Sequence, residues 1–316
     1  MRTPTTFLAA ALAGLTLAAG CVKENDAPGV AEAIPTAEQV QIRLPEGGQQ
    51  FQALGATADF YVLTRGVTRS LNAGAAWVLI VVHTIVQFDP TTVEGNVYTW
   101  GPWEGGALDP ARYQLVVTAN DDGTYDWTLD GQNKGSTGPF ITIINGHAVP
   151  DGDPGEAPHR GSGDFYVDFD AGEEVNPIDN TPDTGNVLVT YDLAARVVTM
   201  HAEGVDDLNN PASFDYLYDE NDDGSGDFQF AIDANFEDSE TAANESALIR
   251  SRWEPTGAGR SDAMLSGGDL GAVEVTASEC WDQLFRRVYY SDSQEWQPTE
   301  GNAADCAFAD AAMPDL

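Results

Sequence analysis

The sequence predicts a mainly β protein, an antiparallel meander that forms a curled sheet or barrel with an N-terminal apolar helical segment packed against it. Three observations lead to this prediction. Apolar residues recur every three or four positions over residues 57–88, which is typical of one helical face. Beyond Asp89 apolar and polar residues alternate. Clusters of Gly, Asp, Asn and Pro interrupt this alternation about every eight to twelve residues, which is typical of short strands joined by turns.

Residues 1–20 have the composition of an export signal. One basic residue, Arg2, precedes an apolar stretch, which ends in small residues before Cys21. The ending "LAAGC" resembles the lipobox of bacterial lipoproteins, in which the cysteine carries the lipid and becomes the new N-terminus. This resemblance implies that residues 1–20 are a signal peptide and that Cys21 is lipidated. In lipoproteins of this kind a residue other than aspartate after the cysteine is typical of the outer membrane, so the resemblance, with Val22 there, also implies that location. Secretion without a lipid, or a chance ending in small residues, is the alternative.

Residues 21–50 are polar, contain proline and show no sustained period, so we expect a flexible tether between the lipid and the fold. A single β-rich domain is expected over residues 51–316, with its helical segment over residues 57–88. Gly74 is expected to divide or kink that segment, because glycine is unfavourable inside a helix.

The helical segment has one predicted apolar stripe, with Arg65 and Thr68 lying off it. Its members are Phe60, Leu63, Val67, Leu71, Gly74, Val78, Val82 and Ile85. No charge occurs from Ser70 to Phe88, so a membrane span of about 20 residues is an alternative. We favour a helix buried against the sheet, because polar residues such as Asn72 dilute the stretch.

About ten to thirteen strands are expected in consecutive order. Short turns such as "NDDG" and "NDDGSG" join them. Parallel neighbours need a longer crossover, so the strands are expected to form an antiparallel meander. The echo between "GSGDFYVDFDA" at residues 161–171 and "GSGDFQFAIDA" at residues 224–234 is interpreted as turn chemistry that begins a half-buried strand.

A calcium site is one hypothesis for the second of these turns. Asp219, Asn221, Asp223 and Asp227 are spaced like the early ligands of a calcium loop. However, Phe230 stands where the loop's last glutamate belongs, and the flanks have the pattern of strands. An acidic hairpin turn is therefore the favoured alternative, and apart from this possible calcium no cofactor is predicted.

The net charge of −37, with only 14 basic residues, argues against binding of nucleic acid. The sequence contains no G-x-S-x-G, H-E-x-x-H or P-loop motif, so we predict that the protein is not an enzyme. Paired carboxylates such as Asp168 with Asp170 keep a hydrolase of envelope polymers as the alternative. The run "GNVYTWGPWEGG" makes Trp100 and Trp103 candidates for ligand contact.

Lipidation of Cys21 leaves Cys280 and Cys306 as an even pair in an oxidising compartment, so we expect a disulfide between them, with two free thiols as the alternative. The tail "ECWDQLFRRVYYSDSQEWQPTEGNAADCAF" is similar to the end of uncharacterised β-rich bacterial lipoproteins, in which Cys-Trp-Asp and a later Cys close the domain. This resemblance implies a disulfide-closed last strand and carries no activity.

Taken from sequence, the expected function is that of a non-enzymatic binding or structural module, lipid-anchored at the outer membrane of the cell envelope. A curled sheet with an apolar helix as filler or lid can hold a hydrophobic small molecule. The alternatives are the hydrolase and a calcium-dependent adhesion module. The sequence does not identify a protein partner.

Overall fold

The computed structural model describes residues 29–45, 56–104, 108–151, 161–178, 184–205, 210–235, 243–314 and 316. Cys21, the expected signal peptide of residues 1–20 and both ends of the expected tether, residues 22–28 and 46–50, lie outside the described residues. For residues 74–77 only the backbone is described.

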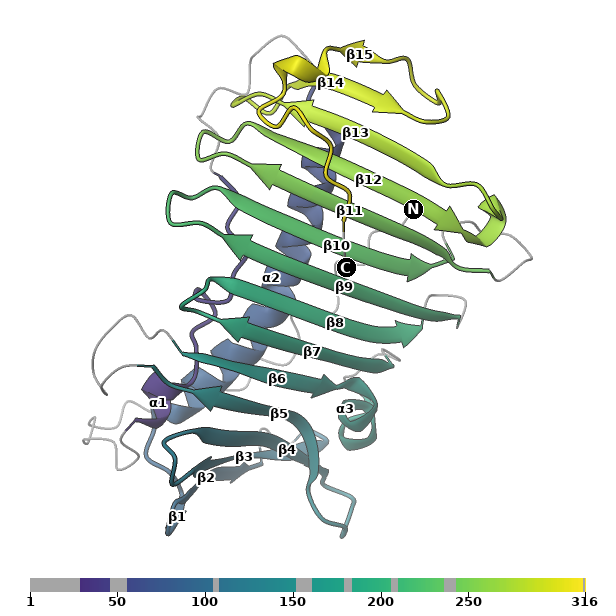
Figure 1. Ribbon diagram of the computed structural model, residues 1–316. Coiled ribbons are helices and arrows are strands. Elements are labelled where there is room, and N and C mark those ends of the chain that lie inside the picture. The colour runs from purple at the N-terminus through teal and green to yellow at the C-terminus, as the bar shows by residue number, and fades with distance from the viewer. Residues whose placement is uncertain are drawn as a thin grey trace. The chain divides into compact units, whose positions relative to one another are not determined.

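The strands form an antiparallel meander in which each strand is hydrogen-bonded to the next one along the chain (Figure 1). Strands β1 and β15 are the two edges, so the described sheet does not close into a barrel. The predicted fold class is confirmed. The strands are β1 (Thr92–Glu94), β2 (Val97–Trp103), β3 (Ala111–Ala119), β4 (Tyr125–Asn133), β5 (Ile141–Val149), β6 (Ser162–Asp168), β7 (Gly185–Asp192), β8 (Val197–Val205), β9 (Pro211–Glu220), β10 (Gly226–Ala234), β11 (Glu245–Trp253), β12 (Gly259–Gly267), β13 (Val275–Trp281), β14 (Arg287–Asp292) and β15 (Glu300–Gly301).

Helices are few among the described residues. They are α1 (Val30–Ala33), α2 (Asp59–Val86), α3 (Phe169–Val175) and the short 3-10 turns η1 (Gly268–Leu270) and η2 (Ala303–Asp305). Helix α2 corresponds to the predicted segment of residues 57–88. It continues through Gly74 as one helix, so the predicted division there is wrong.

The chain divides into two compact units, whereas a single domain was expected over residues 51–316. The first comprises Met1–Gln41 and Asn72–Ala194, and the second comprises Ile42–Leu71 and Ala195–Leu316. Helix α2 contributes residues to both. No shift of composition at residues 194–195 marks the division in the sequence.

Residues 29–45, expected to be tether, are folded. Ile34 is buried in the first unit, and His83 Nε2 lies 2.8 Å from its carbonyl oxygen. In the second unit Ile42 is buried, and the Arg43 N–H donates to Tyr218 Oη at 3.0 Å. The expectation of a flexible tether is therefore wrong for this stretch, because its few apolar side chains are buried without following a regular period.

A row of alternating glycine and tryptophan crosses four strands of the second unit. Gly226, Trp253, Gly259 and Trp281 are directly opposed from β10 to β13. A Cβ atom at either glycine would clash with an indole ring of the neighbouring strand. Glycine is thus required here so that the rings can lie flat over the adjacent backbone, which is a known way to rescue glycine in strands.

The two similar segments at residues 161–171 and 224–234 contain glycine for the same reason. Gly163 in the first copy lies opposite Tyr191, and Gly226 in the second lies opposite Trp253. In both cases an added Cβ would meet the aromatic side chain. The repeat therefore reflects strand packing as well as turn chemistry.

The first part of α2 packs on the sheet of the second unit through Tyr61, whose ring stacks on Phe285 at 4.1 Å and contacts Trp281 at 5.8 Å. Thr64 and Thr68 are buried, whereas Leu63 is 41% exposed. The predicted stripe is wrong in this part, since the buried face includes two threonines. By length and composition α2 could also cross a membrane, a weak signal that core helices share.

Candidate functional site

The helix-facing side of the second unit contains a fully buried carboxylate. Glu279 on β13 accepts hydrogen bonds from the N–H groups of Asp59 and Phe60, the first residues of α2. These N–H groups have no partner within the helix, and the helix N-terminus carries partial positive charge. Glu279 therefore caps α2 from the sheet.

Arg287 on β14 neutralises this cap. Its Nε donates to Glu279 Oε1 at 2.5 Å, and its Nη2 donates to Asp59 Oδ2 at 2.5 Å. Burial acts to lower the pKa of Arg287, but its bond to Glu279 and the charges of Glu279 and Asp59 raise that pKa above the usual value. The guanidinium is thus a permanent positive charge that makes burial of Glu279 tolerable.

Hydroxyl groups join α2 to the strands next to this cap. Thr64 Oγ1 lies 2.7 Å from Ser251 Oγ, which lies 2.5 Å from Ser261 Oγ. Thr64 Oγ1 also donates to the carbonyl of Phe60 at 2.7 Å. Such a chain needs the helix in one register along the sheet, so it specifies position as well as contributing stability.

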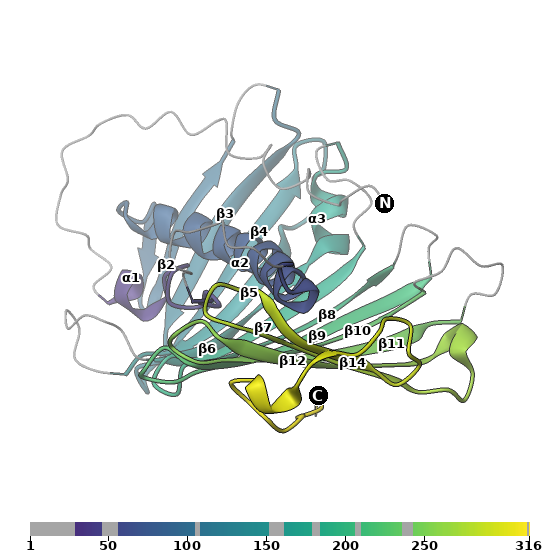
Figure 2. The same cartoon turned by 90° about the horizontal axis from the view of Figure 1, so that it is seen from above.

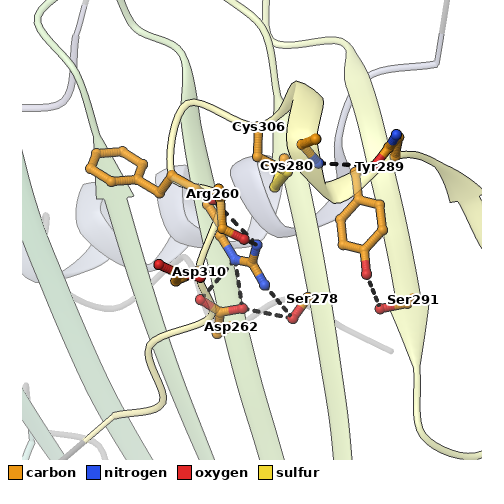
Figure 3. The surroundings of a disulfide bond; sticks show 12 residues. Arg260, Asp262, Ser278, Cys280, Tyr289, Ser291, Cys306 and Asp310 are labelled. Atoms are coloured by element: carbon orange, nitrogen blue, oxygen red, sulfur yellow. Dashed lines mark hydrogen bonds and ion pairs between the residues drawn. A yellow bond between two sulfur atoms is a disulfide. The ribbon is translucent and has the colours of Figure 1, made fainter.

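A different cover lies on the other side of the same strands. Figure 2 shows the start of α2 on one side of these strands and the C-terminal segment on the other. Beneath this segment Arg260 Nε donates to Asp262 Oδ1 at 2.9 Å, and Ser278 Oγ donates to the same oxygen at 2.6 Å (Figure 3). All three side chains are buried.

The C-terminal segment is held through its main chain. Arg260 Nη1 donates to the carbonyl of Ala309 at 2.9 Å, and Arg252 Nη2 donates to the carbonyl of Asp310 at 2.8 Å. The N–H of Ala312 donates to Asp262 Oδ2 at 2.9 Å. The buried ion pair therefore binds both peptide donors and peptide acceptors of the segment that covers it.

A disulfide fixes the start of this segment, as the sequence predicted. Cys280 on β13 and Cys306 after η2 are joined with S–S 2.09 Å and Cα–Cα 5.6 Å. Both residues are buried. The bond places residues 307–312 directly over Arg260 and Asp262 (Figure 3).

Next to the covered ion pair is a polar hollow of about 200 Å³ at one end of β13 and β14. It is lined by residues Thr276, Ala277, Ser278, Ser291, Asp292 and Ser293, of which Ser278 and Ser291 lie directly opposite each other on β13 and β14. Ser291 Oγ lies 2.8 Å from Tyr289 Oη (Figure 3). This hollow can offer hydrogen bonds to a polar ligand.

The loop that follows β14 presents an exposed tryptophan. Asp292 accepts hydrogen bonds from the N–H groups of Gln294, Trp296 and Gln297 at 2.9–3.1 Å. Desolvation acts to raise the pKa of Asp292, but these bonds and one from Tyr290 hold it below the usual value. The carboxylate fixes the loop, while the Trp296 residue remains 63% exposed.

The residues proposed for calcium are used in other contacts. Asp227 forms an ion pair with Arg250, and Asp223 accepts from the N–H and Oγ of Ser225. The amide of Asn221 donates to Ser225 Oγ. Among the residues that the structure describes, no three His, Cys, Asp or Glu side chains form a group suited to a metal ion. The predicted ligands therefore form a hairpin turn and an ion pair, and the structure does not gather them into a calcium site.

Of the two candidate tryptophans, Trp100 belongs to the core of the first unit. It is 2% exposed, and its indole N–H donates to the carbonyl of Phe88 at 2.7 Å. Trp103 is half-buried at the end of β2. A rim contact can involve only Trp103, and ligand binding there stays a prediction.

Two carboxylate contacts bear on the hydrolase alternative. Asp168 accepts from the N–H of Ala171 and caps α3, so it has a structural role. On β8 and β9, His201 Nδ1 lies 2.6 Å from Asp215 Oδ1. The bond to Asp215 raises the pKa of His201 above its usual value, with smaller contributions from Glu203. This cross-strand pair was not predicted from the sequence.

The geometry thus defines an open antiparallel meander whose second unit has one face covered by a helix and the other by a disulfide-linked tail. Comparisons with family models, with curated proteins and with solved structures found no match.

Proposed function

We propose that this protein is a non-enzymatic binding or structural module of the cell envelope, lipid-anchored at the outer membrane through Cys21. The disulfide between Cys280 and Cys306 is the observation that carries this proposal. Disulfides persist in exported proteins and are rare where thiols are kept reduced. The bond therefore supports the interpretation of residues 1–20 as an export signal.

The roles of the buried charged groups support a module without catalysis. Asp262 and Glu279 are both engaged in holding a cover on the sheet. Asp262 lies opposite Ser278, the neighbour of Glu279, so the two carboxylates point to opposite faces. They cannot act together across a cleft, as the pair in a glycoside hydrolase must.

The first experiment tests the anchor. The full chain and a Cys21→Ser variant are expressed in a bacterium labelled with radioactive palmitate, and the membranes are separated on a gradient. We expect label on the full chain in the outer-membrane fraction, and a soluble unlabelled protein from Cys21→Ser. An unlabelled full chain would contradict the anchor.

Native mass spectrometry of the protein purified from that membrane tests the binding role. A retained mass that disappears on denaturation supports a binding module, and its identity separates a hydrophobic molecule from a polar one. A chain of its calculated mass alone would leave only the structural role.

A further inference from the structure

We propose that the outward face of helix α2 lies on the lipid surface of the membrane that carries the Cys21 anchor. This inference rests on the proposed anchor and adds a second contact with the same membrane. The outward face is defined by the exposed residues of α2 that follow Phe60. They include Val62, Leu63 and Arg69 in the second unit, and Ala73 and Ile80 in the first.

The fold leaves much of this apolar helix uncovered. By length and composition α2 could cross a membrane, yet only 29% of its most apolar 18-residue stretch is buried, whereas a core helix is mostly buried. Val62 is 54% exposed and Ile80 is 47% exposed. The opposite face of α2 packs on strands, as the stacking of Tyr61 on Phe285 shows in the second unit. The exposed apolar residues therefore suit a helix that lies flat at the interface between lipid and water.

The charge of α2 differs from that of the chain as a whole. The chain has 51 acidic residues among 316, but residues 60–88 contain no Asp or Glu and include Arg65 and Arg69. Among the residues that the structure describes, neither of these arginines forms an ion pair, whereas Arg260 is paired with Asp262. An anionic lipid surface attracts arginine and repels carboxylates. This face can therefore approach such a surface, although the net charge of the chain is −37.

The position of the anchor brings α2 toward the same membrane. The described chain begins at Gly29, about eight residues after Cys21, and an extended chain of that length spans at most about 30 Å. Within the first unit Ile34 is buried, and its carbonyl oxygen lies 2.8 Å from Nε2 of His83 on α2. Because residues 29–45 are folded, they add no free length to the tether. The lipid is thus held within a short distance of the segment that packs on α2.

The test places a fluorophore on single introduced cysteines of the lipidated full chain, reconstituted in vesicles of phosphatidylethanolamine and phosphatidylglycerol. Labels at Val62→Cys and Ile80→Cys should be quenched by nitroxide-bearing lipids and protected from iodide in the water. The matched controls are Val205→Cys on β8 of the second unit and Leu188→Cys on β7 of the first, both at exposed apolar positions. Labels at the controls should be quenched by iodide and not by the lipids.

A second variant tests the contribution of charge. Arg69→Gln, combined with the label at Val62→Cys, should lower the ratio of lipid-contacting to water-exposed label about fivefold, the loss expected for one arginine near an anionic surface. Replacing phosphatidylglycerol by phosphatidylcholine should lower the same ratio. The matched control Arg196→Gln, at an arginine whose side chain is 43% exposed, should leave the ratio unchanged.

Two results would overturn the inference. In the first, iodide quenches the labels at Val62→Cys and Ile80→Cys as strongly as it quenches the controls, so the face is in water. In the second, these labels are protected from both quenchers, so a second copy of the chain or another protein covers the face. Failure of the proposed anchor is distinguishable from both, because it gives an unlabelled soluble protein in the palmitate experiment.

Discussion

The two faces of the second unit's sheet are covered by different means. On one face a helix is positioned by apolar rings and by the buried cap of Glu279. On the other an irregular segment is positioned by a disulfide and by the main-chain contacts of Arg260 and Asp262. The helix satisfies most of its own backbone groups, so the sheet has to supply only the first N–H partners.

The C-terminal segment cannot satisfy its backbone internally. Its carbonyl and N–H groups would be buried without partners if the strands below were apolar. Charged side chains of alternating sign at Arg260 and Asp262 provide both kinds of partner. The comparison teaches that a helix can pack on a largely apolar sheet face. An irregular segment needs a polar face beneath it, because its own backbone groups have no partners within the segment.

The largest effect is expected from Glu279→Gln. This change removes the charge that pairs with Arg287 and with the helix N-terminus, and it leaves Arg287 without its buried carboxylate partner. Breaking a buried pair in this way costs about 3–5 kcal/mol. Urea unfolding should show a fall in the free energy of unfolding of that size. The matched control Glu274→Gln, at an exposed position just before β13, should change it by less than about 0.5 kcal/mol.

Removal of the disulfide should have the next largest effect. The double variant Cys280→Ala, Cys306→Ala opens a loop with a sequence separation of 26 residues. We expect the free energy of unfolding to fall by about 3–4 kcal/mol, from restored entropy of the unfolded chain. Urea unfolding of the unchanged protein with and without dithiothreitol checks the same quantity. Equal midpoints in the two conditions would mean that the tail is not held by this bond.

Asp262→Asn should weaken the attachment of the C-terminal segment more than the attachment of helix α2. Arg260 loses its carboxylate but keeps the carbonyls of Phe308 and Ala309. We therefore expect a smaller loss than for Glu279, about 2–3 kcal/mol, within the range for hydrogen bonds to charged groups. Limited proteolysis should at the same time cut the C-terminal segment faster. A variant whose tail is cut no faster would show that Asp262 does not hold it.

Thr64→Val tests the hydroxyl chain between α2 and the sheet. The shape of the side chain is kept, while the bond to Ser251 is lost and Ser251 retains Ser261. The expected loss in free energy of unfolding is about 1 kcal/mol. The control Val62→Thr, on the exposed side of α2, should be nearly neutral. Equal effects from both changes would contradict the assigned helix face.

The smallest effect on the free energy of unfolding is expected at His201, which lies on the same face of the sheet as the C-terminal segment but is not covered by it. His201 has its pKa raised by Asp215, so its contribution to stability is fully present below the unfolded value of about 6.5 and is lost as the pH rises through the raised value. Unfolding at pH 5 and pH 8 should show a small difference that His201→Gln removes. A pH dependence that His201→Gln leaves unchanged would show that other groups produce it.

The strand arrangement was predictable because each strand follows the last through a short turn and alternates in polarity. The described strands exceed the expected ten to thirteen by the two edge strands, β1 and β15, which have three and two residues. Such short edge strands have too few residues to show an alternation. The disulfide was predictable because only two cysteines remain once Cys21 is set aside.

The site was not predictable from local patterns. Glu279 is one of 51 acidic residues, and nothing in "TASECW" marks it as buried. Thr68 was assigned to the wrong face, because its hydroxyl donates to the carbonyl of Thr64 and can therefore be buried. Thr64, buried one turn earlier, contacts Ser251, which lies far away in the sequence. Arg260 and Asp262 were not singled out either, because the segment that covers them lies about 50 residues later in the chain.

The most direct test of the two covers is hydrogen–deuterium exchange with and without reduction of the disulfide. We predict that reduction accelerates exchange in residues 303–312 and in β12 and β13 beneath them, while residues 59–71 of α2 exchange at an unchanged rate. Unchanged exchange in residues 303–312, or equal acceleration in α2, would contradict the claim that the two faces are closed independently.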